Sequence, residues 1–225
     1  MKKHWLFYSF FLILIAVSCK KKETAPVDLK YDYFQLVEGA FVEYDVTYIF
    51  HDVALLKHDT INYQIKTQIG DTVIDNSGRI ARKFNRYVRE TSADSWILKD
   101  VWTAIIVDGR AELVEENQRK VKLLFAPTED KTWNINQFNM GETMNASYDS
   151  LDVARTIQNL AFDKTLIVRE QKYTTLIDKI EKYEIYARGV GMIFKQDIDL
   201  TYNFGEAIPK KGTEYYYRIN NYGIE

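Results

Sequence analysis

The feature of this sequence that most constrains its fold is a strict alternation of apolar and polar residues. Over residues 41–50 every second side chain is apolar: Val42, Tyr44, Val46, Tyr48 and Phe50. Residues 61–69 repeat the pattern after a polar turn predicted at His58 and Asp59. A period of two places successive side chains on opposite faces of a strand. The two segments therefore predict an antiparallel hairpin with one face in water.

The rest of the chain shows the same pattern in shorter runs. Strands are predicted at 80–90, 96–107, 111–114, 120–125, 165–170, 177–187, 192–202 and 214–222. Residues 80–90 also satisfy helical spacing, and we assign them to a strand. Within 192–202 an apolar face alternates with a polar face that carries Lys195, Asp197 and Asp199. Gly189 and Gly191 supply the permissive backbone of a tight reversal before this strand.

Two segments depart from strand periodicity. A short helix is predicted in 150–161, with Ser150 and Asp152 as candidate caps. Its apolar residues fall at helical spacing: Val153, Ile157, Leu160 and Ala161. Residues 134–145 are polar, rich in asparagine and without a period, which indicates a long loop, and long loops often carry function.

The composition is typical of a folded, sheet-rich domain. Hydrophobic residues make up 46% of the chain and charged residues 28%, which is enough apolar surface for a core. The 16 tyrosines suit half-buried sheet, and they would equally suit a ligand surface because each has a polar tip. We expect a mainly β fold, a curved antiparallel sheet closing toward a barrel, half-barrel or sandwich, with at most one or two short helices. Residues 31–225 are expected to form it as a single domain.

Two stretches resemble a type of secreted β domain found in bacteria. Residues Tyr33-Phe34-Gln35-Leu36, followed by Gly39 and Tyr44, are similar to a "YFPL…G…Y" opening, with Gln35 in place of the usual Pro. Residues 187–193, Ala-Arg-Gly-Val-Gly-Met-Ile, resemble the closing "YAxGVGxI" hairpin of the same domains. The resemblance implies a β fold and no particular activity.

The N-terminus has the layout of an export signal. Lys2 and Lys3 are followed by an apolar run over 6–17, which ends at Ser18, Cys19 and three lysines. This run is shorter than the roughly 20 apolar residues of a spanning helix. We therefore expect residues 1–18 to be a signal peptide.

The junction Ala16-Val17-Ser18-Cys19 resembles the lipobox of bacterial lipoproteins, with Ala16 where Leu is usual. The resemblance implies cleavage before Cys19 and acylation of that residue with chains such as palmitate, and two or more chains hold a protein firmly on a membrane. Cys19 is the only cysteine, so lipidation would also remove a free thiol from an oxidising compartment. An ordinary secretory signal with a free Cys19 is the alternative.

The residues after Cys19 bear on localisation. Residue 20 is Lys, so the Asp that retains many lipoproteins in the inner membrane is absent, which favours the outer membrane. Lys20, Lys21 and Lys22 have the opposite charge to an acidic surface-export tag, which favours its periplasmic face. Residues 19–30 contain Pro26 and have no period, and we interpret them as a lipidated, flexible tether.

The inventory of reactive residues is thin. Removing Lys2 and Lys3 leaves 28 basic against 32 acidic residues, so nucleic acid is not an expected partner. His51 and His58 would face each other across the first hairpin and bind a metal with Asp52 or Asp59, but a solvated turn is the favoured interpretation. Asp197 and Asp199 lie about 7 Å apart along one strand, a spacing compatible with glycoside hydrolysis. We predict no catalytic residue, metal or cofactor, and Cys19 as the single modified site.

Three functional hypotheses remain open. The preferred one is a membrane-anchored, non-enzymatic binding or accessory module that engages a protein, glycan or lipid through a concave sheet face or the 134–145 loop. The second is a hydrolase of envelope glycan that uses Asp197 and Asp199. The third is a carrier of lipophilic molecules, with an apolar cavity lined by the inward faces of 42–50 and 192–202.

Overall fold

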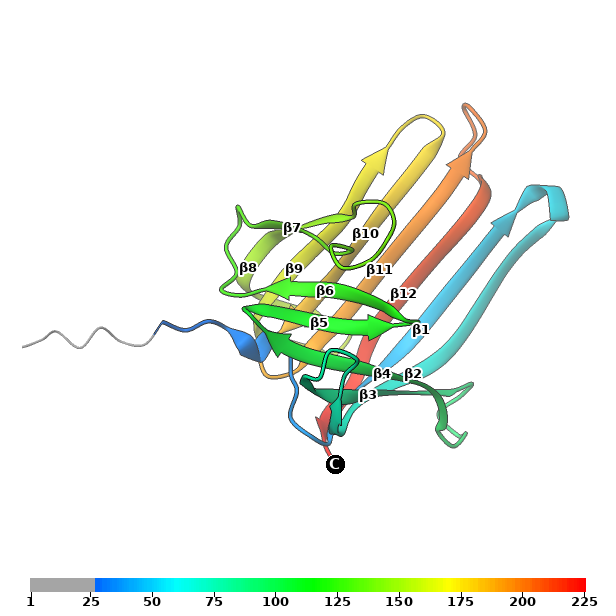
Figure 1. Ribbon diagram of the computed structural model, residues 1–225. Helices are drawn as coiled ribbons and strands as arrows, with labels where there is room; N and C mark the ends of the chain where they lie inside the picture. The colour runs from blue at the N-terminus through cyan, green and yellow to red at the C-terminus, as the bar shows by residue number, and fades with distance from the viewer. Residues whose placement is uncertain (1–26) are drawn as a thin grey trace, which may run out of the picture.

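The computed structural model describes residues 27–225, so the predicted signal peptide and Cys19 lie outside the described residues. The described chain forms one antiparallel sheet of twelve strands (Figure 1). Their bounds are β1 Ala40–Asp52, β2 Lys57–Ile74, β3 Ile80–Arg89, β4 Ile97–Val107, β5 Arg110–Glu115, β6 Gln118–Leu124, β7 Thr132–Asn134, β8 Asn145–Ile157, β9 Leu160–Thr174, β10 Asp178–Ala187, β11 Gly191–Tyr202 and β12 Pro209–Ile224. The predicted mainly β fold with an antiparallel sheet is confirmed.

The strand order places the first and last strands side by side in the middle of the sheet. It runs β6-β5-β4-β3-β2-β1-β12-β11-β10-β9-β8-β7, so two meanders meet where β1 pairs with β12. That pairing extends from Ala40 opposite Ile224 to Asp52 opposite Lys211. β1 is therefore paired on both edges along its full length, and its residues alternate between buried and half-buried from Ala40 to Thr47.

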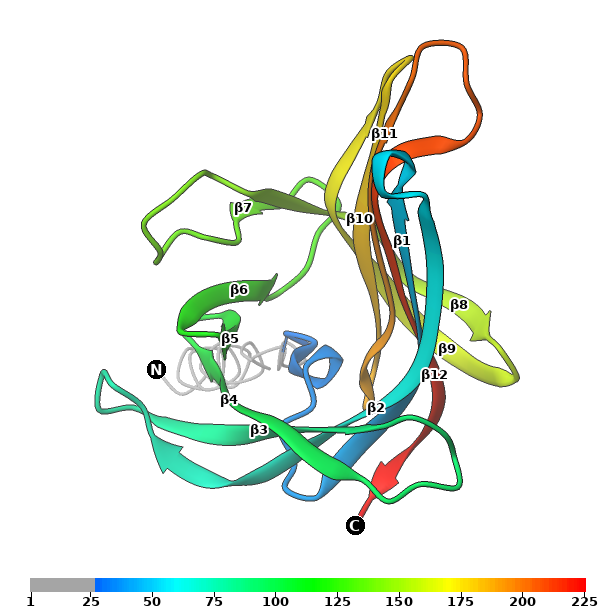
Figure 2. The ribbon, with the colours of Figure 1, turned by 90° about the vertical axis from the view of Figure 1, so that its right-hand side faces the viewer.

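The sheet curls until its two edges nearly meet, which gives an almost closed barrel seen end-on in Figure 2. The segment after β7 completes the contact with β6. The Val121 N–H donates to the Ile135 carbonyl at 3.0 Å, and the Trp133 indole N–H donates to the Val121 carbonyl at 2.9 Å. Tyr148 on β8 adds a hydrogen bond from its hydroxyl to the Leu124 carbonyl at 2.6 Å. These contacts satisfy the backbone of an otherwise open edge strand.

The barrel has a closed end and an open end. At the closed end β3–β6 cross in front of the long strands, whereas the far halves of β1, β2 and β9–β12 extend beyond them as an uncovered curved sheet (Figure 1). β2, with 18 residues, and β12, with 16, are long enough to serve both ends. We use these two names below.

The larger cluster of buried apolar residues lies inside the closed end. It comprises Tyr33, Phe34, Ala104, Ala111, Leu113, Val121, Leu123, Trp133, Ile135, Ala146, Tyr148, Leu166, Val168 and Tyr186. A second cluster includes Phe162, near the turn of the β8–β9 hairpin. This turn lies against the convex face of the sheet, since Gln158 donates to the carboxylate of Asp45 on β1 at 3.1 Å. The hairpin therefore covers part of the outer surface of the barrel.

The helix predicted in 150–161 is wrong. Residues Ser150 and Asp152 lie within β8, and β9 begins at Leu160. Register shifts interrupt the β8–β9 pairing three times between Tyr148 and Arg155, and Asp152 has a positive φ of 53°. Each bulge displaces the alternation by one residue, so that apolar side chains fall at intervals that mimic a helix. Asp152 instead accepts hydrogen bonds from Lys30 and Tyr33, which fasten the N-terminal segment to the barrel.

The first turn also differs from the prediction. β1 and β2 are joined by the short 3-10 helix Val53–Leu55 and by Leu56, whereas His58 and Asp59 belong to β2. Tyr31–Tyr33 forms the other 3-10 helix of the described chain. No helix within residues 27–225 has the length and apolar character needed to cross a membrane. The predicted loop at 134–145 is confirmed between β7 and β8.

Candidate binding groove

Two hollows lie one after the other along the concave face of the sheet, and together we call them the groove. At the closed end it forms a partly enclosed cavity of about 110 Å³, and at the open end it becomes an uncovered depression between β1, β10, β11 and β12. Strand alternation joins the two parts, because the same face of β1 carries Tyr44 in the cavity and Tyr48 in the depression. On β11 the corresponding residues are Lys195 and Asp197.

The apolar wall of the cavity comes from both meanders. It is formed by Phe34, Ala40, Val42, Ile69, Phe84, Trp102, Leu113, Val190 and Met192. Phe84 and Trp102 stack with their ring centroids 6.2 Å apart. The Arg86 guanidinium lies over the Trp102 ring at 4.1 Å and donates to Asp100 at 2.7 Å. This stacking holds a cation against the aromatic wall.

A buried charge cluster forms the polar side of the cavity. Lys122 on β6 reaches across the barrel to Glu184 on β10, with Nζ 2.7 Å from Oε1. Tyr186 donates to the other Glu184 oxygen at 2.6 Å, and the Lys195 ammonium lies 3.7 Å from Glu184. Burial alone would raise the pKa of Glu184, but Lys122 and Lys195 lower it to about 2. Glu184 is therefore a fixed anion between two cations.

The same charge cluster shifts the pKa values of Lys122 and Tyr186. Burial would lower the pKa of Lys122, but Glu184, Glu170 and Glu115 together raise it well above its ordinary value. The pKa of Tyr186 is raised by burial and by the negative charge of Glu184. Both groups therefore keep their protons near neutral pH, and the cavity presents ammonium and hydroxyl donors beside an apolar wall.

A line of tyrosines connects the cavity with the open end. Tyr44 donates to the Met192 carbonyl at 2.8 Å, and Arg86 donates to the Tyr217 hydroxyl at 3.3 Å. The hydroxyls of Tyr63 and Tyr215 are hydrogen-bonded to each other. Of these tyrosines, Tyr44 and Tyr217 line the cavity and Tyr215 lines the depression, and each adds apolar ring area with a polar tip to the lining.

The open depression has polar walls. Its lining residues are Tyr48, Lys182, Asp197, Asp199, Thr201, Lys211, Gly212, Thr213 and Tyr215. The carrier hypothesis expected apolar side chains of 192–202 to face inward. Val42, Tyr44 and Met192 do line the cavity, but Ile198 and Leu200 are buried on the opposite face of β11 from Asp197. A register shift near Tyr186 and Met192 places Met192 on the same side as Lys195.

Comparison with known proteins gives no indication of function, so function is inferred from the geometry of the groove. No family model matches the chain, and no curated protein matches it in sequence.

The two aspartates of the hydrolase hypothesis share one lysine as their ion-pair partner. Lys182 Nζ lies 3.1 Å from Asp197 and 3.5 Å from Asp199, and both carboxylates are accessible to water. Burial would lower the pKa of Lys182, but the two aspartates raise it. This shared ion pair differs from the general acid and base of a glycosidase, which lie on either side of the bond to be cleaved. It is better suited to binding polar groups in the groove.

His51 and His58 lie opposite each other across the first hairpin, as the less favoured metal-site interpretation required, whereas the favoured interpretation of a solvated turn is wrong for the buried His51. The two Nδ1 atoms lie 2.8 Å apart, and His51 Nε2 lies 2.9 Å from Glu214 Oε1. His51 is buried because β1 is central in the sheet and its ring lies over β12. Within residues 27–225, no three His, Cys, Asp or Glu side chains are grouped so as to hold a metal ion.

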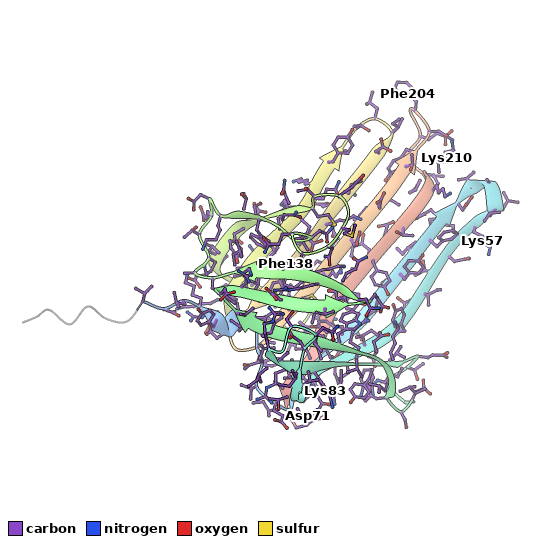
Figure 3. All side chains as sticks on the ribbon, in the orientation of Figure 1. Lys57, Asp71, Lys83, Phe138, Phe204 and Lys210 are labelled. Carbon is purple, nitrogen blue, oxygen red and sulfur yellow. The ribbon has the colours of Figure 1, made fainter. Side chains whose placement is uncertain are left out.

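The 134–145 loop closes the barrel edge and so has a structural role. Asn139 exchanges two hydrogen bonds with the Arg119 backbone, both at 2.9 Å. Phe138, labelled in Figure 3, lies under the Arg119 guanidinium at 3.7 Å. Arg119 in turn pairs with the fully buried Glu112. The loop therefore fastens the outer face of β5 and β6, and the concave groove is the better candidate for binding.

Sequence patterns did not locate the cavity. Lys122 and Glu184 are 62 residues apart and meet only because β6 curls in front of β10. A register shift in the β5–β6 pairing at Ala111 and Glu112 leaves Lys122 out of the ladder alternation. The one available signal was the charged Lys122 between the apolar residues of the segment 121–124, which marks a buried or functional charge.

Proposed function

We propose that the protein is an envelope lipoprotein whose barrel binds an extended ligand along the concave groove. The observation that carries the proposal is that one concave sheet face holds both a cavity with an apolar wall and a charged side and, next to it, an open polar depression. Such concave sites with a few placed polar groups are the usual form of ligand sites.

The cavity volume limits the kind of ligand. A volume of about 110 Å³ is smaller than the roughly 300–1,000 Å³ of sites that enclose a drug-sized molecule. The cavity therefore takes one small end of the ligand, and the remainder lies on the open face. Lys122, Lys195 and Arg86 at the cavity and Lys182 outside it favour a ligand with hydroxyl or anionic groups. The cavity is too small and too charged to enclose a whole acyl chain.

The membrane anchor remains a proposal from the sequence. The layout of 1–18 and the lipobox-like junction at Cys19 support a lipoprotein on the periplasmic face of the outer membrane. Replacing Cys19 by Ser should release the protein from membranes, and mass spectrometry of the wild-type N-terminus should find fatty acid. Quantitative membrane retention of the Ser variant without any fatty acid on the native chain would contradict the lipoprotein proposal.

The ligand proposal is tested by two lysines on opposite faces of β10. Native mass spectrometry of the protein purified from its own envelope identifies what is bound. Lys182→Gln, in the groove, should weaken binding of that molecule roughly tenfold, the usual effect of losing a charged hydrogen bond. Lys179→Gln is the matched control, because residue 179 pairs with Leu200 on the convex face. Equal affinities for both variants, or no bound molecule at all, would overturn the groove as a binding site.

The hydrolase alternative is tested separately. The double change Asp197→Asn and Asp199→Asn removes both carboxylates while keeping their size. Any turnover of peptidoglycan or polysaccharide by the wild-type protein should then persist unchanged. Loss of that turnover in the double variant, with the fold intact by circular dichroism, would favour catalysis over binding.

A further inference from the structure

The hairpin turns at the open end form a row of exposed apolar residues. The β1–β2, β11–β12 and β9–β10 hairpins are neighbours in the sheet, and their turns lie at the same end (Figure 1). Leu56, Phe204 and Leu176, one from each turn, are 93%, 77% and 76% exposed. Large apolar side chains this exposed add nothing to the core. We call these three turns, residues 53–56, 203–208 and 175–177, the tip row.

The conformation of Leu56 supports a role outside the fold. Its φ of 54° is in the left-handed region, which suits glycine or asparagine and is rare for a bulky side chain. Only its backbone takes part in the turn, by donating to the Val53 carbonyl at 3.1 Å. Folding alone would be served better by a smaller residue, so the leucine indicates a contact with something else.

The charges near the tip row are unevenly satisfied. The carboxylates in or next to these turns accept hydrogen bonds from groups of the same turn: Asp52 from the Leu55 N–H, Glu206 from the Asn203 amide and Asp178 from the Thr175 hydroxyl. Asp52 lies opposite Lys57 and Lys211 in the strand register, but in the described chain no carboxylate lies within 4.0 Å of the ammonium group of Lys57, Lys210 or Lys211. Figure 3 shows Lys57, Lys210 and Phe204 at this end of the molecule. The row therefore combines apolar tips with unpaired cations just behind them.

The shape of the row favours a lipid surface over a protein partner. Each hairpin is two strands wide, so neighbouring tips are separated by roughly 10 Å. A stable protein interface needs about 800 Å² of contiguous, complementary surface on each side. A bilayer accepts separate apolar projections one by one, and lysines behind them remain at the headgroups.

We propose that the tip row docks on a lipid bilayer with anionic headgroups, inserting Leu56, Leu176 and Phe204 below the headgroups. The row adjoins the groove, because Lys211 and Gly212 line the open depression and follow the β11–β12 turn. Docking therefore brings the open end of the groove to the membrane surface. The docking contact itself does not depend on the proposed ligand function.

Dye placed on single tip residues tests this contact in the natively processed full chain. Leu56→Cys and Phe204→Cys are labelled with an environment-sensitive fluorophore and reconstituted in vesicles of phosphatidylglycerol and phosphatidylcholine that carry acyl-chain quenchers. Ile80→Cys is the matched control. Ile80 is 69% exposed, but it begins β3 and pairs with Ile74 at the end of β2 that is far from the tip row. We expect blue-shifted, strongly quenched emission from 56 and 204, and unquenched emission from 80.

The same assay separates charge from burial and from the lipid anchor. Replacing Lys57, Lys210 and Lys211 by Gln should weaken insertion of the Leu56 dye about fivefold for each lysine on anionic vesicles, and should change nothing on phosphatidylcholine alone. If the dyes at residues 56 and 204 are as little quenched as the dye at residue 80, the docking proposal is overturned, even if a protein is later found to bind the tip row. The wild-type chain is labelled in parallel. A reactive Cys19 there would contradict lipidation, and the tip assay is then read in a Cys19→Ser background.

Discussion

The closed and open ends of the barrel use the same strands for opposite purposes. On β10, Glu184 at the closed end is fully buried and bound by Lys122, whereas two residues earlier Lys182 forms its ion pairs in contact with water. The ion pair of Glu184 is held in place by burial. The Lys182 ammonium, by contrast, can exchange its aspartate partners for water or a ligand. A long strand can therefore supply rigidity at one end and a binding surface at the other.

The largest expected effect comes from breaking the buried pair. Lys122→Met should destabilise the protein by about 3–5 kcal/mol, because it leaves the Glu184 carboxylate buried without its closest cation. Chemical denaturation measures the change. Lys122→Met combined with Glu184→Leu should recover most of the loss, since it removes both charges. A loss well below 1 kcal/mol for the single variant would contradict the contrast between the two ends.

Acid should act on the closed end through the same carboxylate. The pKa of Glu184 falls from its ordinary 4.5 to about 2 on folding, so the unfolded chain binds the proton more tightly. The stabilisation from this group is complete above pH 4.5 and is lost as the pH falls from there toward 2. Denaturation midpoints across this range should show the loss in the wild type. The Lys122→Met/Glu184→Leu variant should lack this part of the dependence, and an unchanged pH profile would exclude Glu184 as its source.

A smaller effect is expected at Gly212, where β12 enters the groove. Its φ of 132° is in the region that favours glycine, and an added Cβ would clash with the Asp199 carbonyl oxygen. Gly212→Ala should therefore cost more than about 1 kcal/mol and distort the depression. Gly205→Ala, also at positive φ but with no atom within 4 Å of the added Cβ, is the control for backbone strain alone. Equal losses would show that the approach to Asp199 is relaxed at no cost.

The sequence predicted most strands because one face of the sheet is buried and the other is wet. It failed at 150–161, where three bulges broke the period of two, and at the β1–β2 turn, where Leu55 and Leu56 are apolar residues in a loop. An exposed apolar turn has no local signal that separates it from a strand. The polar face at Asp197 was predicted, but not its position in a groove, because that depends on which way the whole sheet curves.

The smallest effect on the free energy of unfolding should come from a charge removed at the open end. Lys182→Met removes two ion pairs in which Asp197 and Asp199 are 36% and 55% exposed, so water replaces much of what the lysine provided. We expect a loss below about 1 kcal/mol by chemical denaturation, against the several kcal/mol of Lys122→Met. A loss as large as that of Lys122→Met would show that the open end depends on its charges for folding. A small loss leaves Lys182 free to exchange its aspartates for a ligand, which is what a binding surface on a rigid barrel requires.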